Sequence, residues 1–143
     1  MNYQEARKFL STVKNINYGG CLLSAWAIYK FCKQNNFEIP AIYCLEKKLF
    51  ISDHIINRSY LRTKEGSPVS PSHVVWSFDG KTYYDAEEKV DMSEYPFILH
   101  LPEKEIDNFC KIALESGTWN KDFNRKKWLP EIEKNLGINL STT

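Results

Sequence analysis

The stretch Asn15–Cys21, Asn-Ile-Asn-Tyr-Gly-Gly-Cys, runs directly into Leu22–Tyr29, Leu-Leu-Ser-Ala-Trp-Ala-Ile-Tyr. Two consecutive glycines favour a tight, open turn of the backbone. The apolar run after them is long enough to form a buried helix, so Cys21 stands where that helix is expected to begin. A helix N-terminus presents unpaired N–H groups and a partial positive charge, which favour a thiolate over a thiol. The pattern therefore predicts a nucleophilic cysteine, with the glycines leaving room for a substrate backbone to approach its sulfur.

A second stretch, residues 72–85, is predicted to form a β-hairpin because β-branched and aromatic residues flank Asp79-Gly80. The register of this hairpin decides whether its polar residues meet. A two-residue turn at Asp79-Gly80 pairs His73 with Ala86 and turns Asp85 away from His73. A three-residue loop, with Gly80 in the left-handed conformation, pairs His73 directly with Asp85. We expect the three-residue loop, with Asp79 acting only as a turn residue.

The combination of Gly-Gly-Cys opening a buried helix, a later His on a strand and an Asp on the neighbouring strand resembles the papain-like fold superfamily. Within it, the chain is most similar to small bacterial and phage members related to transglutaminase-like cysteine peptidases, whose order Cys, His, Asp it shares. The resemblance covers roughly residues 15–88. It implies an α+β fold in which N-terminal helices, including the nucleophile helix, pack on a small antiparallel sheet. Helices at the C-terminus are expected as an addition to that pattern.

This resemblance implies a cysteine-dependent hydrolase of the peptidase, amidase or isopeptidase type that forms a covalent acyl-enzyme. Cys21 is the expected nucleophile and His73 the general base, while Asp85 fixes the tautomer and orientation of His73. The backbone N–H of Cys21 is one expected oxyanion donor. Asn15 and Asn17 stand where papain relatives prefer Gln before the cysteine, so they are the candidates for a second donor. Both asparagines are also good turn formers.

Three other interpretations remain open. A catalytically inactive papain-like binding module, for example a phage or bacterial inhibitor of a host system, keeps the fold and loses turnover. An acyl transferase of the transglutaminase type resolves the acyl-enzyme with an amine in place of water. An unrelated α+β protein could share the family pattern by accident, with Cys21 as a structural core cysteine. The reactivity of Cys21 distinguishes the hydrolase from the binding module.

Length and composition favour a single domain over residues 1–143, and the resemblance implies that this domain is papain-like. The hydrophobic content of 43% is typical of a globular protein with a proper core. The formal net charge of +1 gives no reason to expect nucleic acid or a membrane as partner. The resemblance implies a peptide or protein substrate as the partner. The start of the chain lacks the apolar run of a signal peptide, and no apolar stretch approaches the ~20 residues of a membrane span. We therefore expect a cytoplasmic protein, with its oligomeric state left open.

The cysteines and histidines give no sign of a metal site. The four cysteines have no paired spacing, which favours reduced thiols. Three of them lie on apolar faces and are expected in the core: Cys32, Cys44 and Cys110. Because there is no Cys-x-x-Cys and no close His pair, neither a metal nor another cofactor is expected. His54, beside Asp53, is a rival base without clear strand context, and His100 is expected to be structural.

The remaining segments predict further elements. Helices are expected over 2–14, from Cys21 to about Lys33, from Pro102 to about Ser116, and over 125–136 with an interruption at Pro130 and a stop at Gly137. Strands are expected over 39–45, 49–51 and 95–101, while 53–60 fits a helical turn or a strand. Residues 62–71 have the composition of a loop, which either shapes substrate access to His73 or is a plain connector.

Overall fold

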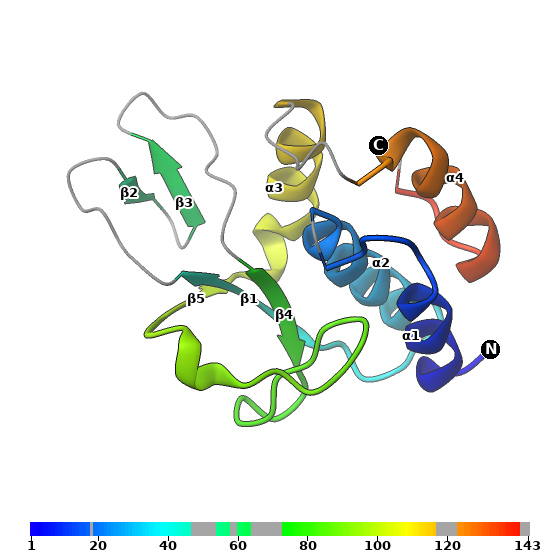
Figure 1. The fold of residues 1–143 in the computed structure, drawn as a ribbon, viewed down its shortest axis with the longest axis horizontal. Helices are drawn as coiled ribbons and strands as arrows, with labels where there is room; N and C mark the ends of the chain where they lie inside the picture. The colour runs from blue at the N-terminus through cyan, green and yellow to red at the C-terminus, as the bar shows by residue number, and fades with distance from the viewer. Residues whose placement is uncertain (18, 47–53, 58–59, 64–72, 117–122, 141–143) are drawn as a thin grey trace.

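The computed structural model contains four α-helices and a three-stranded antiparallel sheet, so the expected α+β class is confirmed (Figure 1). It describes residues 1–17, 19–46, 54–57, 60–63, 73–116 and 123–140. In chain order the elements are α1 (Tyr3–Ser11), α2 (Cys21–Gln34), β1 (Ala41–Glu46), β2 (His54–Asn57), β3 (Tyr60–Thr63), β4 (His73–Ser77), the 3₁₀ turn η1 (Met92–Glu94), β5 (Phe97–Leu101), α3 (Glu103–Ser116) and α4 (Arg125–Leu136). Within these ranges no helix has both the length and the apolar character needed to cross a membrane.

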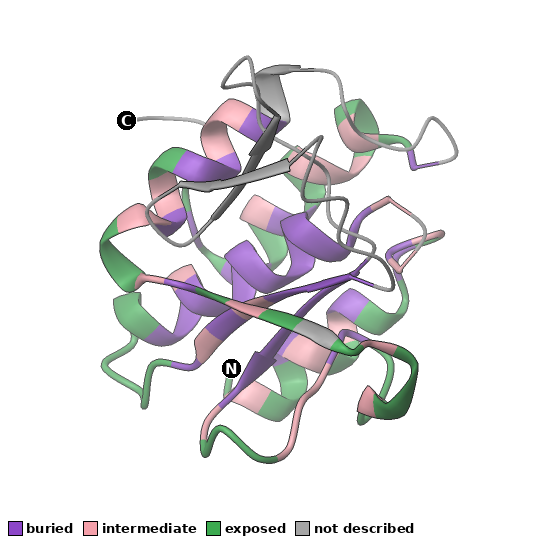
Figure 2. Cartoon of the chain, turned by 90° about the vertical axis from the view of Figure 1, so that its left-hand side faces the viewer, coloured by how far each residue is buried: buried purple, intermediate pink, exposed green. Residues whose placement is uncertain are grey.

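Helix α2 lies at the centre of the fold because it is apolar on nearly every side. Eleven of its 14 residues are buried. The sheet covers one side of α2, and the other three helices contact the rest of it (Figure 1). Buried residues accordingly gather in this central helix and in the strands beside it (Figure 2). The predicted start at Cys21 is confirmed, and the helix ends at Gln34, one residue beyond the predicted end at about Lys33. Asn35 caps it, and Asn36 adopts a left-handed φ of 59°.

Strand β1 occupies the middle of the sheet, antiparallel to β4 on one side and to β5 on the other. Leu45 of β1 pairs with His73, the first residue of β4. All five residues of β4 are buried, although β4 is at the sheet edge. Tyr84 covers that edge through a single bridge to Trp76. Strands β2 and β3 form a separate two-stranded hairpin, so the expected strand within 53–60 is present.

The chain after β4 returns in a different register from the one expected. Trp76 and Tyr84 exchange both backbone hydrogen bonds, with N···O distances of 2.9 and 2.8 Å, whereas the expected loop would place Trp76 opposite Thr82. The cause is the carboxylate of Asp79, which accepts hydrogen bonds from the backbone N–H groups of Lys81 and Thr82 and so closes a wider loop. Asp79 is therefore a turn residue as expected, but the predicted register is wrong.

Helix α4 is continuous through Pro130, so the expected interruption there is wrong. Pro130 is exposed, and so is Lys126, whose carbonyl loses its helical partner to the proline. Water can therefore replace the missing hydrogen bond. The expected stop is confirmed, since Gly137 caps the helix at a left-handed φ of 66°. The strand predicted over 49–51 lies outside the described residues, as does nearly all of the loop predicted over 62–71.

Gly20 allows α2 to pack closely against its neighbours. A Cβ added at Gly20 would stand 2.7 Å from the backbone oxygen of Ile16 and 2.8 Å from Cε2 of Phe123. We expect Gly20→Ala to lower the free energy of unfolding by about 1–3 kcal/mol, because the backbone or the ring must move. Gly137→Ala is the matched control: no atom of the described residues lies within 4 Å of its added Cβ, so it should cost only about 1 kcal/mol through its left-handed backbone.

Urea unfolding of the wild type and both variants measures these losses, and equal losses would contradict the packing role of Gly20. The space that Gly20 leaves is filled by Phe123. Gly20 therefore serves the packing of α2, and the expectation that the two glycines leave room for a substrate backbone near Cys21 stays a prediction.

Candidate active site

His73 and Asp85 form a buried, hydrogen-bonded pair. Nε2 of His73 lies 3.0 Å from Oδ2 of Asp85, and each residue is only 7% exposed. His73 is held at the first position of β4 by its pairing with Leu45. Asp85 directly follows Tyr84, which bridges to the edge of the same strand. The structure thus brings together the two residues whose contact the sequence predicted, but by a different register.

A tight turn from Asp85 to Glu88 directs the carboxylate of Asp85. Its Oδ1 accepts hydrogen bonds from the N–H groups of Glu87 and Glu88, both at 2.9 Å. Oδ2 is consequently left for His73. Burial acts to raise the pKa of Asp85, but the hydrogen bonds from His73 and from the two backbone N–H groups bring that pKa below its ordinary value. Asp85 is therefore ionised at neutral pH and faces the His73 ring as an anion.

Cys21 is the third residue at this place. Its side chain acts on the pKa of His73 as a hydrogen-bonding neighbour, and because Nε2 of the ring faces Asp85, we infer that Nδ1 is the nitrogen on the side of the sulfur. Burial acts to lower the pKa of His73, but the hydrogen bonds with Asp85 and Cys21, together with the negative charges on both partners, raise it to about 9. The ring is then an imidazolium at neutral pH, which stabilises negative charge on the neighbouring sulfur.

The first turn of α2 offers backbone donors beside this sulfur. Gly20 is the N-cap residue and supplies no capping side chain. The first helical hydrogen bond runs from the N–H of Ser24 to the carbonyl of Gly20, so the N–H groups of Cys21, Leu22 and Leu23 have no acceptor within the helix. These N–H groups and the helix dipole favour an anion placed next to Cys21.

The two asparagines before Cys21 differ in their surroundings. Asn15 adopts a left-handed φ of 61° in the connection between α1 and α2, as a turn-forming asparagine does. Asn17 is half-buried, and its buried Oδ1 has no hydrogen-bond partner among the described residues. A contribution of either asparagine to an oxyanion site stays a prediction.

Two residues that the sequence analysis did not single out also contact the site. Tyr95 stacks on His73, with ring centroids 6.1 Å apart and an angle of 23° between the planes. Arg7 of α1 donates hydrogen bonds to the backbone oxygens of Asp85 and Glu87, at 3.4 and 3.1 Å. Both contacts join segments far apart in the sequence. Arg7 lies within the helix expected over residues 2–14, and nothing in the sequence marked either contact.

The other two histidines, His54 and His100, lie on strands other than β4. His54 lies on β2, opposite Thr63, so of the two alternatives for residues 53–60 the strand is the one observed. His100 is exposed on β5, where its ring lies 5.2 Å from that of Tyr43, centroid to centroid. In the part of the chain that the structure describes, no group of three His, Cys, Asp or Glu side chains could hold a metal ion.

The other three cysteines are buried in the core, as expected. Burial raises the pKa of Cys32 to about 11, and burial with nearby negative charge raises that of Cys44 to about 12. Burial likewise raises the pKa of Cys110 well above its ordinary value. Thiols of this kind are inert at neutral pH. Cys21 differs from them in its place at a helix N-terminus and in its contact with His73.

The arrangement is chemically that of a nucleophile, a base and an orienting acid: a thiol at a helix N-terminus, an imidazole in contact with it, and a carboxylate on the far ring nitrogen. It can support attack of the sulfur on an electrophilic carbon, with proton transfer through the imidazole. Comparisons of the chain with models of protein families, with curated proteins and with solved structures found no match.

Proposed function

We propose that the protein is a cysteine-dependent hydrolase with a papain-like fold, which cleaves an amide, isopeptide or thioester bond through an acyl-enzyme on Cys21. The observation that carries the proposal is the buried His73 ring, with Asp85 3.0 Å from its Nε2 and with Cys21 near enough to raise the pKa of the ring. A thiol, an imidazole and a carboxylate in this order are the minimum set for nucleophilic catalysis by cysteine.

In the first half of the proposed reaction, on an amide, the sulfur of Cys21 attacks the carbonyl carbon of the substrate and a C–S bond forms. The carbonyl oxygen becomes an oxyanion, which the N–H groups at the start of α2 stabilise. As the C–N bond breaks, His73 gives its Nδ1 proton to the leaving amine. The products of this half-reaction are a free amine, a thioester on Cys21 and a neutral His73.

In the second half, neutral His73 takes a proton from water at Nδ1, and the water oxygen attacks the thioester carbon. The C–S bond then breaks, the carboxylic acid leaves, and the pair of imidazolium and thiolate is restored. Asp85 keeps a proton on Nε2 throughout, so Nδ1 is the nitrogen that exchanges protons. Tyr95 and Arg7 act indirectly, by holding the His73 ring and the turn that carries Asp85.

A transferase of the transglutaminase type would share the first half-reaction and use an amine in the second. Hydrolysis is our proposal because water requires no second binding site. The inactive binding module would keep the fold without forming a thioester. These alternatives differ in what happens at the sulfur of Cys21, so the experiment should detect the acyl-enzyme itself.

p-Nitrophenyl acetate is a suitable probe because an activated ester acylates a nucleophilic thiol without resembling the natural substrate. We expect a stoichiometric burst of p-nitrophenolate and an acetyl group on Cys21, located by peptide mass spectrometry. Cys21→Ala should abolish the burst. Cys32→Ala, which removes a fully buried thiol from the same helix, should keep it. Acetylation confined to lysines, with Cys21 unmodified, would overturn the proposal and favour the binding module.

A further inference from the structure

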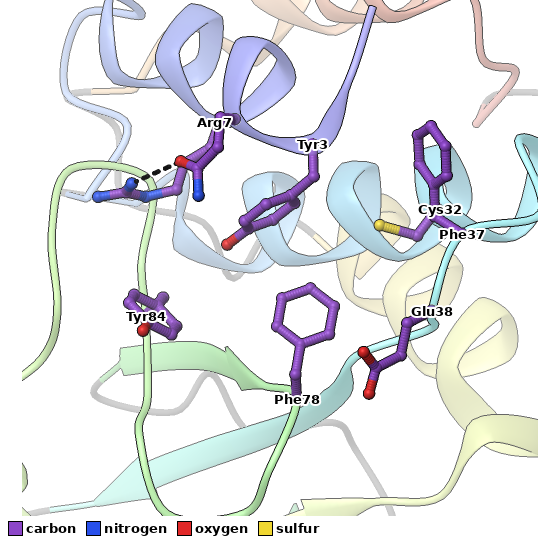
Figure 3. Close-up of a pocket in the computed structure, with 8 residues that line it drawn as sticks. Tyr3, Arg7, Cys32, Phe37, Glu38, Phe78 and Tyr84 are labelled. Atoms are coloured by element: carbon purple, nitrogen blue, oxygen red, sulfur yellow. Dashed lines mark hydrogen bonds between the residues drawn. The ribbon is translucent and has the colours of Figure 1, made fainter.

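A cavity of about 460 Å³ lies between α1, the end of α2 and the segment after β4 (Figure 3). Its volume is within the range of about 300–1,000 Å³ that is usual for small-molecule sites. Cys32, at its wall, is eleven residues beyond Cys21 on α2, a distance of roughly 16 Å at the helical rise. The cavity therefore lies apart from Cys21, although Arg7 and Tyr84 on its wall adjoin the Asp85 turn, and no step of the proposed reaction takes place in it.

Aromatic rings from three segments line this cavity: Tyr3, Phe37, Phe78 and Tyr84 (Figure 3). Tyr3 and Phe78 meet edge to face, with ring centroids 5.1 Å apart and planes at 87°. The hydroxyl oxygen of Tyr3 accepts a hydrogen bond of 2.7 Å from the indole N–H of Trp76, which fixes the position of the ring. These contacts make a preformed aromatic slot that needs little rearrangement to accept a flat ligand.

The two charged residues of the cavity are not equally available to a ligand. Arg7 is engaged, because its guanidinium donates hydrogen bonds to Gln4 and to the Asp85 turn and lies over the ring of Tyr84. Glu38 lies on the opposite side of the Tyr3 and Phe78 rings (Figure 3). It is exposed and forms no ion pair with another described residue. Among the residues that line the cavity, Glu38 is therefore the charged side chain left to bind a ligand, while Arg7, bonded to neutral oxygens, keeps its positive charge.

We propose that this cavity binds a small arylalkylamine, with the aromatic ring of the ligand between Tyr3, Phe37 and Phe78 and its ammonium group on the carboxylate of Glu38. The ring fits the slot because aromatic side chains pair favourably with another ring. The ammonium fits because both the aromatic faces and the carboxylate attract a cation. This binding site is independent of the role proposed for Cys21.

Phenethylamine is the probe that tests the site, by titration into the full-length protein with amide shifts followed by NMR. We expect saturable binding with a Kd of about 1 mM, as suits so small a ligand. The shifts should centre on the residues around Glu38 and Phe78. Glu38→Gln should weaken binding about fivefold or more, while Glu131→Gln, which changes an exposed carboxylate on α4, should leave the affinity unchanged.

3-Phenylpropionate, which carries a negative charge in place of the amine, should bind at least about tenfold more weakly. The Cys21→Ala variant should bind phenethylamine as the wild type does, so failure of the proposed hydrolase activity leaves this result unaffected. Absence of saturable shifts up to about 10 mM phenethylamine, equal affinity of Glu38→Gln, or equal binding of the anionic analogue would each overturn the proposal.

Discussion

Replacing Asp85 with Asn is expected to slow acylation of Cys21 by about 10³-fold. Oδ1 at this position accepts hydrogen bonds from the N–H groups of Glu87 and Glu88. An asparagine must keep its oxygen there, so its NH₂ group would face Nε2 of His73. That group is a donor, which forces the ring proton onto Nδ1 and leaves no acceptor for the proton of Cys21. The rate of the p-nitrophenolate burst measures the effect.

Asp79→Asn is the matched control for this variant. Asp79 also accepts two backbone N–H groups within a tight turn, from Lys81 and Thr82, but it does not contact His73. Cys21 should therefore be acylated at the wild-type rate in the Asp79→Asn variant. If Asp85→Asn and Asp79→Asn behaved alike, the carboxylate of Asp85 would have no role in orienting His73.

The free energy of unfolding should fall by about 3 kcal/mol between pH 6 and pH 9.5 through His73 alone. The folded-state pKa of His73 is raised from 6.5 to about 9 by its hydrogen bonds with Asp85 and Cys21, against the effect of burial. The native state therefore binds a proton more tightly than the unfolded chain does. The resulting stabilisation is fully present below pH 6.5, the pKa of His73 in the unfolded chain. It is lost as the pH rises through about 9, the pKa of His73 in the folded protein.

Urea unfolding of the wild type and of His73→Gln, at both pH values, measures this contribution, because groups that do not interact with His73 titrate alike in both proteins. The stability difference between the two proteins should narrow by about 3 kcal/mol at the higher pH. His100→Gln, which removes an exposed histidine, should follow the wild type. A difference between wild type and His73→Gln that is the same at both pH values would mean that His73 is not held as an imidazolium.

The central helix could be predicted from the sequence because its signals are local. A glycine pair, a long apolar run and Asn35-Asn36 are enough to place both ends of α2 within a residue or two. The burial of Cys32 on that helix follows from the same apolar run. Long-range pairings leave no such local signal. The position of β1 between β4 and β5, for instance, depends on which strands meet after the chain collapses.

The candidate site likewise combines features that the sequence predicts with features that it does not. The approach of Asp85 to His73 was predicted, but through a register that the side chain of Asp79 overrides by widening the loop. Asp85 still reaches His73 because a second turn, which its own Oδ1 closes, directs the carboxylate inward. The contacts of Arg7 and Tyr95 could not be predicted, since each depends on how distant segments pack.

The most direct test of the account is the selective alkylation of Cys21 by iodoacetamide in the folded protein near pH 6, with each cysteine followed by mass spectrometry. Cys21 is 9% exposed and the other three cysteines are at most 2% exposed, so selectivity alone could reflect access. His73→Ala is therefore measured in parallel, with His100→Ala as its control. The account predicts that Cys21 reacts first in the wild type and in His100→Ala, and that His73→Ala loses this advantage. Slow labelling of Cys21, or fast labelling that survives His73→Ala, would contradict it.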